Sequence, residues 1–148
     1  DAFMVDFRHL EQLAAEVQGL PCARCVTHRD FHLGNLLIGR KGTVYGIDFE
    51  NKNEDDALRD VISILFDFAI KRPANATEIE HLQTAAVAFW EGYGDHATAP
   101  LVFEFFQTFS ALNGWSGLER RNLPDQGKQQ RLKWFKLLAK TSLLNLSR

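Results

Sequence analysis

The segment at residues 57–72, ALRDVISILFDFAIKR, is apolar on nearly every side of a helix, and it constrains the fold more than any other part of the chain. A helix with one polar face can lie on a surface, whereas a helix that is apolar all round has to be surrounded by other elements. Pro73 ends the pattern, because proline has no amide hydrogen to continue a helix. We therefore predict a helix that begins near Ala57 and lies buried in the middle of a domain.

Four further segments carry apolar residues at helical spacing and can surround that central helix. We expect these helices over residues 6–18, over residues 77–91, from residue 100 to about residue 112, and over residues 128–144. Thr77 and Glu80 fit a capping box at the start of the second of them. Asn113 and Gly114 are expected to end the third, since both residue types are common just past a helix end.

Two short apolar runs, LLI at residues 36–38 and TVYGI at residues 43–47, flank a connection with glycine at both ends, and this pattern predicts a β-hairpin. The polar loop HRDFHLGN, residues 28–35, precedes the hairpin, and IDFE closes it. We expect one mainly α domain (α+β) over residues 1–148, with about five helices around a hairpin that gathers the polar motifs.

The composition excludes several classes of partner. The 148 residues are 45% hydrophobic, which is enough for a core, and the net charge of −2 provides no bulk field for nucleic acid or an anionic membrane. The longest apolar run covers residues 61–70, far short of the roughly 20 residues that a membrane helix needs. The first residues lack a signal-peptide pattern. We expect a cytoplasmic protein that binds neither nucleic acid nor membrane.

The two cysteines, Cys22 and Cys25, precede His28 and His32 at a spacing that four zinc ligands could have. A thioredoxin-type motif should open a helix after a strand, whereas here Pro21 precedes the cysteines and a strand-like pair follows them. Because His28 belongs to a more specific pattern, we favour two ordinary reduced cysteines.

That pattern is H-x-D-x-x-x-x-N, with His28, Asp30 and Asn35 at its three fixed positions. Three uncommon residue types at a set spacing arise by chance in such a chain with a probability on the order of one per cent. Asp48 follows at the exit of the predicted hairpin, and Asp60 opens the apolar helix twelve residues later. Packing gains little from acids and an amide in such loops, so their order indicates chemistry.

In these residues the sequence resembles the kinase-like phosphotransferases, and more closely the aminoglycoside phosphotransferase and choline kinase group than the protein kinases. The resemblance is strong from His28 to Asp60, and beyond Asp60 it rests on helical character. It implies the C-terminal lobe of a protein-kinase-like fold. Protein kinases would have glycine after Phe49, where this chain has Glu50, and an Ala-Pro-Glu segment that is absent here. A protein substrate is therefore disfavoured.

The implied reaction is transfer of the γ-phosphate of ATP, with Mg²⁺, to a hydroxyl of an amino-sugar, amino-alcohol or related metabolite. By resemblance, Asp30 would orient the acceptor hydroxyl and take its proton as general base. Asn35 would offer its side-chain oxygen to Mg²⁺, and Asp48 would be the principal Mg²⁺ ligand, because a hard cation prefers carboxylate oxygen. The hairpin would bring these two loops to one metal ion.

The resemblance gives the remaining motif residues supporting roles. His28 would pack beneath the loop and bind backbone groups, and Asp60 would accept backbone N–H groups of the catalytic loop and hold it rigid. Glu50 would assist the metal ion through water or else be an ordinary surface residue. His32 matches no fixed position and is interpreted as a local residue that could lie near a phosphate.

The acidic run Glu54, Asp55 and Asp56 is a weaker candidate for acceptor binding. It lies between the expected metal ligand Asp48 and the buried helix, and an amino-sugar acceptor would favour its charge. The ordinary interpretation of such a charge run is a solvated loop. Both interpretations stay open from the sequence alone.

A second weak candidate is a cation-binding surface of Trp90 and Tyr93 near Glu91, which a choline-type acceptor would favour. Other aromatic residues have helical spacing and are expected mostly in the core, with room for one of them to line an acceptor pocket. These residues are Phe103, Phe105, Phe106, Phe109, Trp115 and Trp134.

The sequence has no glycine-rich loop over phosphates and no strand lysine with a helix glutamate, which the resembled family keeps in a separate N-terminal lobe. The chain also begins with Asp1. We therefore expect the C-terminal lobe of a larger enzyme, without its nucleotide lobe and inactive alone. The alternative is a non-catalytic remnant that serves binding or assembly, with self-association through the exposed lobe interface.

Overall fold

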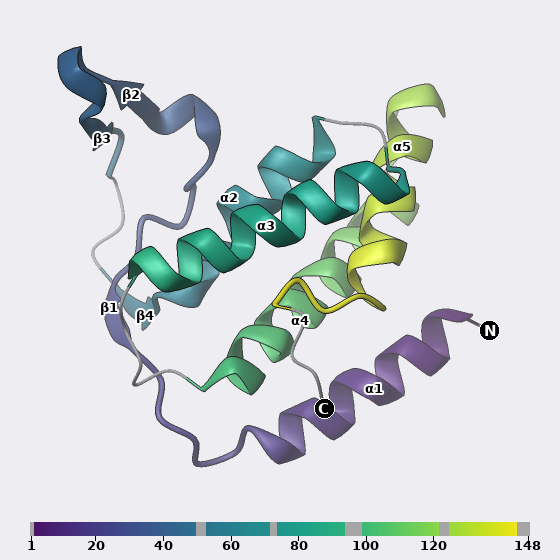
Figure 1. Ribbon diagram of the computed structural model, residues 1–148. Coiled ribbons are helices and arrows are strands. Elements are labelled where there is room, and N and C mark those ends of the chain that lie inside the picture. The colour runs from purple at the N-terminus through teal and green to yellow at the C-terminus, as the bar shows by residue number, and fades with distance from the viewer. Residues whose placement is uncertain (1, 50–52, 72–73, 94–98, 122–124, 145–148) are drawn as a thin grey trace.

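The computed structural model of the chain is mainly helical and describes residues 2–49, 53–71, 74–93, 99–121 and 125–144 (Figure 1). Within these ranges the structure has five α-helices and two small antiparallel strand pairs. This confirms the expected fold class. The helices are α1 (Ala2–Glu16), α2 (Leu58–Ile70), α3 (Ala76–Tyr93), α4 (Pro100–Glu119) and α5 (Asp125–Leu138).

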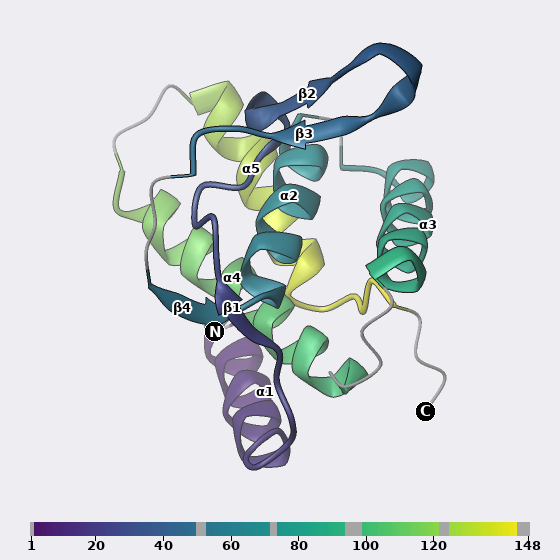
Figure 2. The same ribbon diagram turned by 90° about the vertical axis from the view of Figure 1, so that its left-hand side faces the viewer.

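Helix α2 occupies the centre, as its apolar sequence predicts. It packs against α3, α4 and α5, and Figure 2 shows it enclosed between the other helices and the strands. Helix α1 packs against α4. The fully buried residues of α2 recur three and four positions apart and form one face, while the other residues of the helix, except the exposed Arg59, are half-buried. These buried residues are Leu58, Val61, Ile62, Leu65, Phe66 and Ala69.

The predicted hairpin is present. Strands β2 (Leu36–Ile38) and β3 (Val44–Gly46) pair antiparallel, with Leu37 opposite Tyr45. The connection between them contains Lys41 at φ 71° and Gly42 at φ 79°, the left-handed conformation that lets so short a loop reverse the chain.

A second strand pair was not predicted. Strand β1 (Arg24–Val26) pairs antiparallel with β4 (Glu54–Asp56), and Cys25 lies opposite Asp55. An acidic triplet has low β-propensity, so its strand conformation comes from the tertiary pairing. The consequence is functional, because the pair brings the segment before residue 28 against the segment before α2.

Two predicted helix boundaries are wrong at the start of α3 and the end of α5. The cap of α3 is Asn75, whose Oδ1 accepts the Glu78 amide at 3.0 Å, rather than Thr77. Helix α5 ends at Leu138 instead of continuing to residue 144. The buried side chain of Gln107 donates through Nε2 to the carbonyls of Leu138 and Thr141, which satisfies carbonyl groups where the helix unwinds.

The predicted end of α4 at Asn113 and Gly114 is also wrong, since the helix continues to Glu119. Gly114 does not end the helix; it allows α4 to pack closely against α5. A Cβ atom placed on it would lie 2.5 Å from the ring of Phe135, so α4 and α5 can only approach this closely over a glycine.

None of the helices in the described ranges combines the length and the apolar character that a membrane-spanning helix requires.

Gly114→Ala should therefore destabilise the protein, with overpacking of about 1–3 kcal/mol outweighing a gain in helix propensity of up to about 1 kcal/mol. Gly117→Ala is the matched control in the same helix, because a Cβ atom placed on Gly117 would have no neighbouring atom within 4 Å. It should leave the free energy of unfolding unchanged or raise it. Urea unfolding of both variants measures this, and equal stabilisation by both would contradict the packing role of Gly114.

Candidate active site

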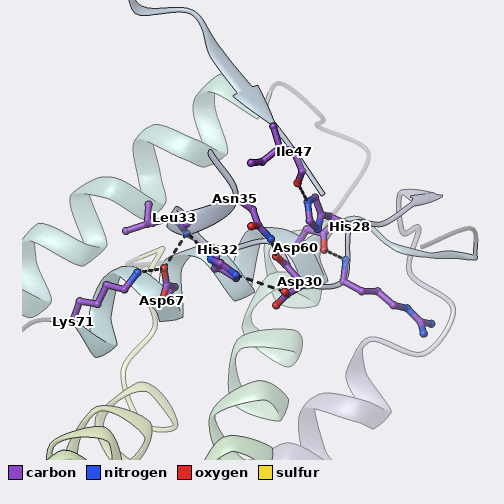
Figure 3. Close-up of polar contacts among 11 residues, drawn as sticks. His28, Asp30, His32, Leu33, Asn35, Ile47, Asp60, Asp67 and Lys71 are labelled. Carbon is purple, nitrogen blue, oxygen red and sulfur yellow. Dashed lines mark hydrogen bonds and ion pairs between the residues drawn. The ribbon is translucent and has the colours of Figure 1, made fainter. Parts of the chain in front are cut away.

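The loop that follows Thr27 is held by the first turn of α2. Asp60 accepts the backbone amide of His28 with Oδ2 and the amide of Arg29 with Oδ1, the latter at 2.9 Å (Figure 3). Both carboxylate oxygens are thus engaged by the loop backbone. Hydrogen bonds to a charged acceptor are stronger than neutral ones, so this contact fixes the entrance to the loop.

Asp67 holds the other end of the loop, and the sequence interpretation missed it. Its Oδ2 accepts the Leu33 amide at 2.9 Å and the Lys71 ammonium at 2.7 Å. Asp60 and Asp67 are seven residues apart, about two helical turns, so both project from one face of α2. The available signal was an acid within an apolar helix at this spacing from Asp60.

The environment of Asp67 favours its charged form. Burial alone would raise the pKa of this carboxyl, but the hydrogen bonds from Lys71 and Leu33, together with the charges of Lys71 and His32, lower the pKa below its ordinary value. Asp67 therefore remains a charged acceptor for the loop amide to a lower pH than an ordinary carboxyl would.

His28 lies buried beneath the loop, where its Nε2 is 2.7 Å from the carbonyl oxygen of Ile47. Because a carbonyl only accepts, Nε2 carries the hydrogen. The Ile47 amide in turn donates to the carbonyl of Asn35 at 3.0 Å. The residue at the exit of the hairpin is thus bound to both ends of the motif, and Asp48 follows it directly.

Asn35 is buried, and its Nδ2 donates to the backbone carbonyl of Asp30 at 3.0 Å. This bond sets the orientation of the amide and leaves Oδ1 as the atom that can bind a cation. The Asp30 side chain is 79% exposed, so a substrate can reach its carboxylate. The loop therefore combines a fixed backbone with an accessible acid.

His32 contacts Asp30, which the sequence did not predict. Its Nδ1 accepts the Gly34 amide at 3.0 Å, and its Nε2 therefore carries the hydrogen and lies 3.6 Å from Asp30 Oδ2 (Figure 3). A Cβ atom on Gly34 would lie 2.8 Å from the His32 ring. The glycine thus allows the ring to approach its own turn and face the acid.

Arg29 and Asp48 both adopt left-handed backbone conformations, at φ 66° and φ 65°. This conformation costs a residue with a side chain about 1–2 kcal/mol; it occurs in turns, as at Lys41, and it also clusters at functional sites. One strained residue is therefore the predicted metal ligand Asp48 itself, and the other, Arg29, directly precedes the predicted base Asp30.

Asn35 and Asp48, the predicted magnesium ligands, both lie in the described part of the chain. No group of three or more histidine, cysteine, aspartate or glutamate side chains gathers in the described ranges closely enough to hold a metal ion. The donors expected here, the exposed Asp48 carboxylate and Asn35 Oδ1, are hard oxygens, and Mg²⁺ commonly takes one or two carboxylates together with phosphate oxygens. The residues fit that mode. Glu50 lies outside the described residues.

The acidic run is not a solvated cluster. Asp55 Oδ2 lies 3.5 Å from Arg29 Nη2 and 3.2 Å from Arg59 Nε, whereas Glu54 is exposed. Asp56 is buried and accepts the Leu58 amide at the start of α2. Burial raises the pKa of the Asp56 carboxyl, and the Leu58 hydrogen bond offsets this only in part. The sequence offered Asp56 as a contact for the phosphoryl acceptor, and this is corrected: Asp56 caps the start of α2.

The aromatic candidate on α3 is also corrected. The Trp90 ring packs edge-on against Phe103, 5.6 Å between centroids, and joins the core. Glu91 is exposed and lines a separate hollow on α3. Figure 2 shows α3 on the side of α2 away from β1 and β4. The side chain of Tyr93 lies outside the described part.

The zinc interpretation fails for a similar reason. Cys22 and Cys25 are exposed free thiols, as expected, while His28 and His32 are engaged by Ile47 and Gly34. Partial desolvation, followed by nearby carboxylates with Asp60 first among them, raises the pKa of the exposed Cys25 thiol. A raised pKa lowers the thiolate fraction that metal binding or redox exchange would need.

Comparison with known proteins places these residues in a family. The model of the phosphotransferase enzyme family matches residues 4–102, about two thirds of the chain, which include the loop, the hairpin and α2. Searches of curated proteins and of solved structures give no match.

Asp67→Asn should lower the free energy of unfolding by about 1–2 kcal/mol near pH 7, because the loop amide and Lys71 lose a charged partner. The lowered folded pKa means that the stabilisation is present above the ordinary carboxyl pKa and is lost as the pH falls through the folded pKa. The urea unfolding free energies of wild type and variant should therefore converge as the pH falls below the ordinary carboxyl pKa.

Asp56→Asn should change stability with pH in the opposite direction from Asp67→Asn. The folded pKa of Asp56 is raised, so the stability contributed by its carboxyl is present at low pH and is lost as the pH rises through that pKa. The variant should therefore gain stability relative to wild type from acidic to neutral pH. Parallel pH trends for the two variants would contradict the assigned environments.

Proposed function

The chain belongs to the phosphotransferase enzyme family, and from this premise we propose that it serves ATP- and Mg²⁺-dependent phosphoryl transfer to a hydroxyl of an amino-sugar, amino-alcohol or related metabolite. The observation that carries the proposal is the state of Asp30. Its carboxylate is accessible, while the loop around it is held at three backbone amides by Asp60 and Asp67. An accessible acid on a fixed backbone is suited to positioning a reacting hydroxyl.

In the proposed reaction Asp30 accepts the proton of the acceptor hydroxyl. The oxygen attacks the γ-phosphorus, the bond to the β-phosphate oxygen breaks, and ADP leaves with that electron pair. The His32 Nε2–H faces Asp30 Oδ2 at 3.6 Å and would orient the carboxylate toward the hydroxyl. General base catalysis of this kind typically contributes about 10²–10⁴ in rate.

Asp48 and Asn35 would hold Mg²⁺, which when bound neutralises charge on the β- and γ-phosphates. Two contacts support this assignment. Ile47, which directly precedes Asp48, is hydrogen-bonded to His28 and to Asn35. The Asn35 Nδ2 group donates to the Asp30 carbonyl, so Oδ1 is the atom left to coordinate the metal ion. We further propose that these 148 residues are inactive alone, because the sequence contains neither the glycine-rich loop nor the strand lysine that holds ATP.

A binding or assembly module is the second candidate function. The hairpin supports it, since Leu37, Ile38, Val44 and Tyr45 are each more than half exposed on it. Exposed apolar side chains that adjoin one another are typical of interaction surfaces, including self-association. A module of this kind would have no need of Asp30 or Asp48, and the two experiments that follow separate the candidates.

The first experiment measures metal binding by the chain itself. Mn²⁺ takes the same oxygen ligands as Mg²⁺ and can be followed by water-proton relaxation. Asp48→Asn should weaken Mn²⁺ binding by about tenfold, since the amide removes the charged ligand. Glu80→Gln, an exposed acid on α3, is the control and should bind as wild type does. Equal affinity of both variants would reject the metal role of Asp48.

The second experiment measures phosphoryl transfer by the full-length gene product. Asp30→Asn should lower kcat by about 10²–10⁴ because the general base is lost. Stability to urea should not change, since the Asp30 side chain is exposed. Glu80→Gln again serves as the control. Unchanged kcat in Asp30→Asn would favour the binding module.

A further inference from the structure

A cavity of about 360 Å³ lies between α2 and α4 beside the candidate active site. Its lining includes Arg29, Arg59 and Asp60 on the side of the loop and Phe106 and Phe109 on α4. The volume is within the range of about 300–1,000 Å³ that small-molecule sites occupy. Arg29, which lines the cavity, directly precedes Asp30 in the chain, so the cavity adjoins the loop that carries the proposed base.

The charged side chains of the lining differ in how much of their hydrogen-bonding capacity is already used. Both oxygens of Asp60 already accept loop amides. Arg29 and Arg59 share a single acceptor, Asp55 Oδ2, at 3.5 and 3.2 Å. Each guanidinium carries five N–H donors, and within the described part of the chain these contacts use few of them. The remaining polar residues of the lining, Ser63, Ser110 and Asn113, are neutral and can both donate and accept, so the charged groups with unused hydrogen-bonding capacity in the cavity are the two guanidinium groups.

Arg59 is also held in place by the aromatic wall. Its guanidinium carbon lies 5.8 Å from the ring centroid of Phe106 and 6.0 Å from that of Phe109. A planar guanidinium held against rings presents a preformed fork that matches a carboxylate or phosphate. The same rings supply an apolar surface for the body of a ligand.

The backbone of Arg29 gives an independent indication. At φ 66° this position would be unstrained as glycine, yet the chain carries a long cationic side chain there. Strain that persists beside a reactive group indicates that the residue serves a function. The Arg29 side chain is about half exposed, and it reaches the cavity.

We propose that this cavity binds the phosphoryl acceptor through an anionic group, a carboxylate or a phosphate, held by Arg29 and Arg59. The inference rests on the proposed function for the identity of the bound molecule as acceptor. It assigns the acceptor a negative charge next to the reacting hydroxyl. Asp55, which an amine was expected to contact, instead orients the two arginines.

The test is a calorimetric titration of the 148-residue chain with four probes of related size. Three share one ring and one hydroxymethyl group: 4-(hydroxymethyl)benzoate, 1,4-benzenedimethanol and 4-(hydroxymethyl)benzylamine. Phenyl phosphate is the fourth and separates a phosphate from a carboxylate source. An anionic probe should bind about tenfold or more tightly than the amine, the scale of one charge-assisted contact. An amine that binds as tightly as both anions would overturn the proposal.

The variants locate the binding. Arg29→Gly and Arg59→Gln should each weaken the preferred anionic probe by about tenfold and leave the diol unchanged. Lys41→Gly is the matched control, because Lys41 is also an exposed cation in a left-handed conformation, at φ 71°, but lies in the hairpin loop. It should bind like wild type, and Arg29→Gly should keep its melting temperature because glycine relieves the strain. Equal losses in Lys41→Gly would indicate bulk charge and reject the site.

The titration contains no ATP and no Mg²⁺, so its outcome is separate from that of the kinase proposal. If Asp30→Asn abolishes transfer while the cavity prefers the amine, the phosphotransferase function stands and the anionic acceptor is rejected. If transfer is unaffected by Asp30→Asn while the arginines select the anions, the anion site stands without its role in catalysis.

Discussion

The candidate site depends on two carboxylates that project from one face of a buried helix and accept backbone amides of one loop. Asp60 holds its entrance, and Asp67 holds it three residues past Asp30. This support is rigid because α2 is enclosed by other helices and cannot shift without opening the core. A loop with an arginine at positive φ would not keep its conformation without such a support.

The hairpin completes the arrangement by its register. Ile47 is hydrogen-bonded to His28 through its carbonyl and to Asn35 through its amide, so the backbone position just before Asp48 is fixed. A slip of one residue in the pairing of β2 with β3 would exchange the faces of every hairpin side chain and move Asp48 away from this point. The hairpin therefore places chemistry while contributing little to the core.

The sequence predicted those features that short-range patterns determine. The central helix and the hairpin follow from periodicity and turn residues, and the hydrogen-bonding partners of Asp60 follow from the resemblance to the kinase-like phosphotransferases. It did not predict the pairing of β1 with β4 or the role of Gly114, because each depends on a segment distant in the chain. A glycine that ends a helix and a glycine under a neighbouring ring have the same local sequence.

The acidic run shows most clearly why local charge does not determine a binding site. In the sequence Glu54, Asp55 and Asp56 are three adjacent negative charges and favour a cationic acceptor. In the fold one is buried as a cap and another is shared by two arginines that arrive from different segments. The charged groups with unused hydrogen-bonding capacity in the cavity are guanidinium donors, so the cavity beside this loop has the opposite charge preference from the one that the sequence suggests.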